Sequence, residues 1–196
     1  MPASTSKPPE RDTPEQQDAI ELLTIDHDNV KALFQQFDEL TEQEGVDEEK
    51  ARIVEQICNE VTLHAQVEEE IFYPAVREAI DDDDIVDEAD VEHATAKDLI
   101  SQLEAMAPGD DHYDATVAVL GEYINHHVDE EEGEMFEQAR ASDLDTGALG
   151  AAIAARKLEV MAEMGIDDDV TEDDELPPTG SAKVGGARKS RTPARR

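Results

Sequence analysis

The sequence lacks tryptophan and contains a single cysteine, Cys58. One cysteine excludes an intramolecular disulfide and a redox-active cysteine pair. No apolar run approaches the ~18 residues that a membrane-spanning helix needs. Residues 1–11 are polar and include Pro2, Pro8 and Pro9, which is not the pattern of a signal peptide. We therefore expect a cytoplasmic protein with no membrane segment.

Basic residues are also scarce. The chain has 16 Lys and Arg against 51 Asp and Glu, a formal net charge of −35. Six of the basic residues lie after position 182, so the preceding chain has only ten basic residues against all 51 acidic ones, a net charge of −41. Such charges repel one another in a compact fold, and salt at 0.1 M screens them only beyond roughly 10 Å. The composition indicates a halophilic source, with an acidic low-salt protein as the alternative, and argues against nucleic acid as a partner of the core.

Apolar residues recur with the 3.6-residue period of amphipathic helices, and no segment shows the alternation of a strand. Thr13 is expected as the N-cap of the first helix, which Gly45 should end, and Pro74 should kink the second. Helices are expected at about 13–45, 47–80, 84–107 and 111–139, followed by a shorter one at 143–164.

These helices predict an all-α fold: an antiparallel up-down-up-down four-helix bundle with a short fifth helix and disordered termini. The domain is expected at 13–165, between a disordered N-terminus at 1–12 and a disordered, acidic-then-basic tail at 166–196. The last residues, KSRTPARR, resemble basic arms that contact nucleic acid, but binding would be weak beside so acidic a body. Folding back onto the acidic domain is the alternative.

Two copies of one short pattern, His-x-x-x-Glu, lie 63 positions apart. His64 and Glu68 form the first copy, and His127 and Glu131 form the second. Residues i and i+4 lie on one face of a helix, so each copy aims an imidazole and a carboxylate at one point. A lone histidine precedes each copy at a similar distance, and these two residues are His27 and His93.

The apolar residues around the histidines repeat in the same register. Three and ten positions after His27 are Val30 and Phe37, and the same positions after His93 are Ala96 and Leu103. Two equivalent helical hairpins would therefore bring all four histidines and both glutamates into the core. Burying them is costly unless they are paired or bound to a cation. A His–Glu hydrogen-bond network that only specifies packing is the alternative.

Four imidazoles and two carboxylates are too many ligands for one tetrahedral zinc ion. Divided between two metal ions, they give each ion two imidazoles and a share of both carboxylates. This set of donors suits a first-row transition metal. The remaining coordination positions would be open to water, O₂, peroxide or NO.

The segments HAQVEEEIFYP and HHVDEEEGEMF, with the two lone histidines, resemble the hemerythrin-like (HHE cation-binding) family over roughly 14–139. The acidic composition would make this a haloarchaeal member. The resemblance implies two non-haem iron ions, with Mn or Zn as alternatives. It implies that the carboxylates bridge the two ions. The implied ligands are His27, His64, Glu68, His93, His127 and Glu131.

The resemblance further implies a protein that binds or responds to O₂, NO or reactive oxygen species, in sensing, scavenging or iron handling. An enzyme of iron–sulfur repair or of peroxide or NO reduction is the alternative. We rank it lower because the sequence shows no second cofactor motif or cysteine pair to supply electrons. The third hypothesis is a helical bundle in which the metal only stabilises the fold. The sequence does not indicate the oligomeric state.

Several residues near the predicted ligands bear on the ligand assignment and on the implied function. The oxygen carriers of the family have a fifth histidine one turn from the third-helix ligand, and Ala89 and Lys97 occupy those positions here, which argues against reversible O₂ carriage. His126 points about 100° away from His127 on a helix, and aligning the two Glu-Glu pairs selects His127. We expect Glu69 and Glu132 to be solvated; the alternative is that they are additional metal ligands or hydrogen-bond to the ligands. We expect core packing for Tyr73 and Tyr123, with hydrogen bonding toward the metal ions as the alternative. Cys58 is expected in the core and His112 on the surface.

The halophilic interpretation predicts a folded state that depends on salt. Circular dichroism should show helical content rising from about 20 mM to about 2 M KCl, because screening relieves repulsion among the carboxylates. A protein that is fully folded and equally stable at both concentrations would contradict the interpretation.

Overall fold

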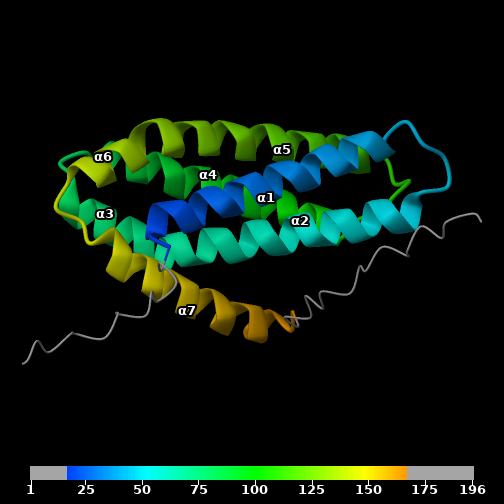
Figure 1. The fold of residues 1–196 in the computed structure, drawn as a ribbon. Coiled ribbons are helices and arrows are strands. Elements are labelled where there is room, and N and C mark those ends of the chain that lie inside the picture. The colour runs from blue at the N-terminus through cyan, green and yellow to red at the C-terminus, as the bar shows by residue number, and fades with distance from the viewer. Residues whose placement is uncertain (1–16, 167–196) are drawn as a thin grey trace, which may run out of the picture.

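In the computed structural model, which describes residues 17–166, every regular element is helical. Four long helices run antiparallel and form a bundle (Figure 1). They are α1 (Ala19–Leu40), α2 (Asp47–Val67), α4 (Asp83–Glu104) and α5 (Tyr113–Glu130). The turns η1 (Glu68–Phe72) and η2 (Glu131–Met135) lead into α3 (Tyr73–Ala79) and α6 (Phe136–Ala141), and α7 (Thr146–Met164) follows. The described residues confirm the predicted up-down-up-down bundle with a fifth helix.

The first helix is shorter than the sequence suggested. Asp18 is its N-cap and accepts a hydrogen bond from the backbone N–H of Glu21, while the Glu21 side chain accepts one from the N–H of Asp18. This capping box fixes the start. The helix ends at Leu40, and Gly45 lies in the following loop with a φ of 76°. The expected cap at Thr13 lies outside the described residues, as do the predicted disordered segments apart from Ile166.

Two π-helical turns interrupt the second and fourth helices of the bundle, whereas the sequence suggested only a kink at Pro74. Pro74 lies at the start of α3, just after the first π turn. The second π turn has no proline nearby, so proline is not the shared cause. Each turn begins at the glutamate of a His-x-x-x-Glu motif, Glu68 or Glu131. The motif is therefore the feature that the two turns share. Short π-helical turns inside α-helices occur often at functional sites.

The buried apolar side chains form two clusters along the bundle. One contains Phe37 and Val128, and the other contains Leu23 and Phe72. A layer of polar side chains lies between them. Of the eight buried polar or charged side chains among the described residues, all but Lys50 belong to this layer: Asp26, His27, His64, Glu68, His93, His127 and Glu131. The apolar clusters on both sides keep water away from that layer.

Helix α7 lies outside the bundle, against α1 and α2 (Figure 1). Its Ile153 is fully buried. Gly150 allows the helix to approach the start of α1, because a Cβ there would lie 2.5 Å from the carbonyl oxygen of Gln17. This helix therefore covers one hairpin of the bundle.

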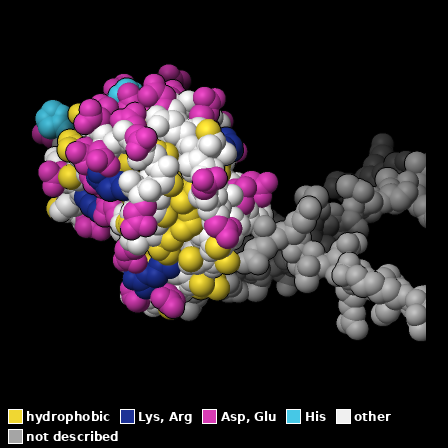
Figure 2. All heavy atoms as spheres, turned by 90° about the vertical axis from the view of Figure 1, so that its left-hand side faces the viewer, with side chains coloured by type: hydrophobic (Ala, Val, Ile, Leu, Met, Phe, Trp, Pro, Cys, Tyr) yellow, Lys and Arg dark blue, Asp and Glu magenta, His cyan; other side chains and the backbone are white. Residues whose placement is uncertain are grey.

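Acidic side chains dominate the end of the bundle that Figure 2 shows, and basic ones are few there. This end of the molecule thus shows the acidic surface that the composition indicated. Within residues 17–166, no helix combines the length and the apolar character that crossing a bilayer demands.

Gly150→Ala should lower the free energy of unfolding by about 1–3 kcal/mol, because the added methyl group overlaps the backbone of residues 17–19. Gly147→Ala on the same helix is the matched control, since its Cβ would meet only Asp145 Oδ1 at 3.7 Å. Urea denaturation in high salt measures both. Equal stability of the two variants would contradict the close approach of α7.

Candidate metal centre

The six predicted residues meet in the polar layer of the bundle, and each long helix contributes one histidine. The Nε2 atoms of His27 and His64 lie 3.0 Å apart. Those of His93 and His127 lie 3.2 Å apart. None of the six residues is more than 8% exposed. Each hairpin thus supplies one pair of imidazoles whose Nε2 atoms face each other.

Each glutamate approaches a histidine of both hairpins. Glu68 Oε1 lies 3.1 Å from His64 Nε2, and its Oε2 lies 3.4 Å from His93 Nε2. Glu131 Oε2 lies 3.2 Å from His27 Nε2 and 3.8 Å from His127 Nε2. Carboxylates placed between two imidazole pairs are suited to bridging two metal ions, as in di-iron carboxylate bundles.

The other ring nitrogen of each of these four histidines contacts a carboxylate from a different helix. His27 Nδ1 lies 2.8 Å from Glu132, and His64 Nδ1 lies 3.3 Å from Asp26. In the second hairpin, His93 Nδ1 lies 3.0 Å from Glu69, and His127 Nδ1 lies 2.8 Å from Glu92. A carboxylate accepts from N–H, so these contacts favour the tautomer with the proton on Nδ1 and leave Nε2 free as a ligand.

These four carboxylates were only partly foreseen. The expectation that Glu69 and Glu132 are merely solvated is wrong, since each accepts a hydrogen bond from a predicted ligand. Asp26 and Glu92 were missed altogether. Their signal was present in the repeat, because each immediately precedes a lone histidine at matching positions of the two halves.

The donor atoms fit a metal ion. Glu68 Oε1 and both carboxylate oxygens of Glu131 are buried without a hydrogen-bond partner. The nearby Nε2 atoms cannot donate to them while the protons sit on Nδ1. Facing lone pairs and unpaired carboxylate oxygens are unfavourable in a buried layer unless a cation lies among them. The donors fall into two groups, each within 4.8 Å: His27, His64, Glu68 and Glu131, and Glu68, His93 and His127.

Protons would otherwise supply the positive charge. Burial disfavours the imidazolium of His64, but Glu68 and Asp26 outweigh burial and raise its pKa to about 10. The pKa of His93 rises to about 9, because hydrogen bonds to Glu68 and Glu69 likewise outweigh burial. Burial alone would raise the pKa of Glu68, yet His64 and His93 hold it well below its ordinary value. A metal ion would displace these protons, since it binds neutral imidazole.

Two aromatic rings lie beside the imidazoles, each five residues after a predicted bridging glutamate. Phe136 stacks on His27 with an interplanar angle of 5°. The Tyr73 hydroxyl lies 3.2 Å from His93 Nε2 and 3.5 Å from Glu68 Oε2. Burial, with the charges of Glu131 and Glu68, raises the pKa of Tyr73 well above its ordinary value, so the phenol keeps its proton.

Two small cavities adjoin the cluster. The first has a volume of about 20 Å³. Apart from the four imidazoles, its walls are apolar: Val30, Val61, Ala65, Ile124 and Val128. The second, of about 10 Å³, is lined by Ala89, Glu131 and Met135 among others. Ala89 occupies one of the two positions one helical turn from His93, where the oxygen carriers of the family have a fifth histidine. At the other, Lys97 pairs with Glu69.

The remaining candidates are not members of the buried cluster. The His126 side chain is 62% exposed. His112, at the start of α5, is also exposed, as expected. Tyr123 is 42% exposed, so the expectation of core packing is wrong for it and right for Tyr73.

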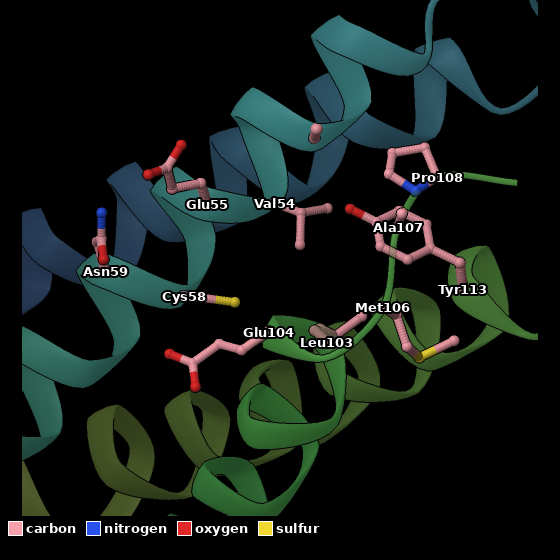
Figure 3. A pocket seen from close by; sticks show the side chains of 11 residues that line it. Val54, Glu55, Cys58, Asn59, Leu103, Glu104, Met106, Ala107, Pro108 and Tyr113 are labelled. Carbon is pink, nitrogen blue, oxygen red and sulfur yellow. The ribbon is translucent and has the colours of Figure 1, made fainter. Parts of the chain in front are cut away.

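A surface pocket of about 390 Å³ lies between α2 and the end of α4 (Figure 3). Cys58 lines it and is otherwise buried in the core, as expected. Burial and the charge of Glu104 raise the pKa of its thiol to about 11, so the thiol stays protonated near neutral pH.

Comparisons with known proteins agree with this geometry. A DNA nickase of Nostoc sp. is 26% identical over 147 residues, which cover 74% of this chain and 40% of that protein. The chain therefore spans about two fifths of that relative's length. The crystal structure of a hemerythrin HHE cation binding domain-containing protein from Mycobacterium kansasii is similar, with a TM-score of 0.63 at 22% identity. The match covers 75% of this chain and 89% of that one, and shows a shared fold.

The sequence model of one family, the hemerythrin HHE cation binding domain, matches residues 18–139. The match spans all four long helices and every residue of the cluster. The chain therefore belongs to the hemerythrin HHE cation-binding domain family.

Proposed function

We propose that the protein holds two iron ions in a non-haem centre and binds or responds to O₂, NO or reactive oxygen species. The family is one of cation-binding domains, and the four imidazoles and two buried carboxylates support two ions rather than one. Mn or Zn remain alternatives, because imidazole and carboxylate serve those metals too. The proposed ligands are the six predicted residues: His27, His64, Glu68, His93, His127 and Glu131.

The observation that carries the proposal is the apolar cavity beside the imidazoles. A volume of about 20 Å³ holds a molecule the size of water. Sites for larger organic ligands have volumes of about 300–1,000 Å³. Its aliphatic walls from Val30, Val61 and Val128 disfavour a charged ligand. The space beside the donor atoms is therefore suited to a small, uncharged molecule such as O₂ or NO.

Bound iron would supply redox chemistry and open coordination positions. The residues of the chain supply the surroundings. Four carboxylates accept hydrogen bonds from the Nδ1 atoms and so hold each imidazole with its Nε2 lone pair toward the centre. The apolar clusters on both sides exclude bulk water. The Tyr73 hydroxyl, 3.2 Å from His93 Nε2, can donate a hydrogen bond to a molecule bound at the centre on the side of the layer opposite the cavity.

Reduction of peroxide or NO is the second candidate. It is favoured by Tyr73, whose protonated phenol reaches the cluster and could deliver a proton there. Electrons would have to come from a separate reductant. Iron–sulfur repair is less well supported, because the single thiol, Cys58, is buried and protonated.

DNA cleavage, the activity in the name of the Nostoc relative, forms no part of the proposal. Acidic side chains dominate the surface in Figure 2 and would repel a phosphate backbone. The matched segment is also a minor part of that relative's length.

Metal analysis of anaerobically purified protein should give about two irons per chain, as expected for a two-ion site. Glu131→Ala and His127→Ala should each lose at least one, because each removes a predicted ligand. His126→Ala is the matched control and should keep both, since its side chain is exposed. Loss of iron in His126→Ala alone would contradict the assigned register. A fully folded wild-type protein whose iron content stays near zero would contradict the whole proposal.

The absorption spectrum tests the gas chemistry. Charge-transfer bands of the oxidised centre should bleach with dithionite and return on exposure to air. Multiple-turnover loss of peroxide or NO with a supplied reductant would favour the enzyme. Tyr73→Phe should then lower the turnover rate by about 10²-fold, because a positioned proton donor contributes at least that much, while leaving the iron content unchanged. A spectrum insensitive to O₂, NO and peroxide would contradict a role in sensing or scavenging them.

A further inference from the structure

A second His-x-x-x-Glu pair lies on α5, one residue before the buried pair. His126 and Glu130 are four residues apart and their side chains are 62% and 38% exposed. The same positions of the first hairpin hold Leu63 and Val67, which are 4% and 0% exposed. The repeat therefore departs from its own symmetry at this pair, where two metal-ligating side chains replace two core residues.

Glu92 of α4 completes a group of donors with this pair. Its Oε1 lies 3.8 Å from His126 Nε2, which in turn lies 3.4 Å from Glu130 Oε1. One atom from each of the three side chains falls within a 4.8 Å span. One imidazole and two carboxylates are donors that suit a divalent first-row metal ion.

The equivalent carboxylate of the first hairpin already has a cation. Asp26 and Glu92 occupy the same position of the repeat, one residue before a lone histidine, and each contacts the other histidine of its hairpin through Nδ1. The second oxygen of Asp26 pairs with the ammonium group of Lys157, which α7 provides. The second oxygen of Glu92 faces His126 instead, and among residues 17–166 no Lys or Arg pairs with Glu92. The protein thus supplies a positive charge beside Asp26, whereas at the equivalent Glu92 a cation from solution could take that place.

The outer group also adjoins the buried centre. The cavity of about 10 Å³ beside Ala89 is lined by Glu92 and Glu130 of the outer group and by His127 and Glu131 of the centre. Both oxygens of Glu131 are buried and lack a hydrogen-bond partner. Glu92 contacts both regions, since its other oxygen lies 2.8 Å from His127 Nδ1. A metal ion held by the outer group would therefore lie next to unpaired donors of the centre.

We propose that Glu92, His126 and Glu130 form an outer site for a divalent first-row metal ion, from which the ion passes inward to the buried centre. The transfer rests on the proposed function, because it needs a centre that holds iron. Metal binding at the outer site does not depend on the proposed function. The site is on the hairpin that α7 leaves uncovered, which keeps His126 accessible from solution.

Binding is tested with Mn²⁺ as the probe, on the full-length protein before and after iron loading, in salt high enough to screen non-specific binding to the acidic surface. Electron paramagnetic resonance of free Mn²⁺ gives the number bound. Iron-loaded wild type should bind one further Mn²⁺ per chain. The double variant His126→Ala/Glu130→Gln should not. Asp129→Asn, which removes an exposed charge from the same helical turn but no donor, should bind like wild type.

Transfer is tested by mixing metal-free protein anaerobically with Fe²⁺ and following the iron that a chelator can no longer remove. The double variant should load at least about tenfold more slowly, because a charged surface site raises association rates by 10-fold or more. Its final iron content should equal that of wild type and Asp129→Asn. Equal loading rates, or equal Mn²⁺ binding in wild type and the double variant, would overturn the proposal. Failure of the proposed di-iron centre gives a different result, in which wild type acquires no chelator-resistant iron.

Discussion

The structure depends on one buried electrostatic constraint. Four imidazoles and two carboxylates lie between two apolar clusters, where unpaired polar atoms are costly. Four further carboxylates fix the imidazoles from outside, so the Nε2 lone pairs turn inward. Only a cation, a proton or a metal ion, can relieve this arrangement. The raised pKa values of His64 and His93 show how strongly the layer attracts positive charge.

The internal repeat explains how so small a chain builds this layer, and its asymmetry explains where the two halves differ. Helix α7 covers the first hairpin, where Lys157 balances Asp26 and core residues fill the outer positions. The second hairpin carries exposed donors at those positions. The aromatic neighbours differ as well, since Tyr73 presents a hydroxyl where its counterpart Phe136 does not. The two hairpins around the buried layer therefore differ: α7 covers the first, and the second carries the exposed donors.

Much of the fold and the cluster followed from the sequence because periodicity and i,i+4 spacing are local properties. They predicted five helices and six side chains meeting at one place. The π turns at Glu68 and Glu131 did not follow, since the pattern does not show where a helix widens. Asp26 and Glu92 were missed because each contacts a histidine on another helix, which depends on how the helices pack. The exposed position of Tyr123 likewise reflects which side of α5 faces solution.

The central claim is that two metal ions occupy the polar layer. Anomalous diffraction at the iron absorption edge, from crystals of anaerobically purified protein, tests it most directly. The account predicts two iron peaks, one at the Nε2 atoms of His27 and His64 and one at those of His93 and His127, with Glu68 and Glu131 between them. A single peak, or no peak in a layer whose histidines keep the same arrangement, would contradict it.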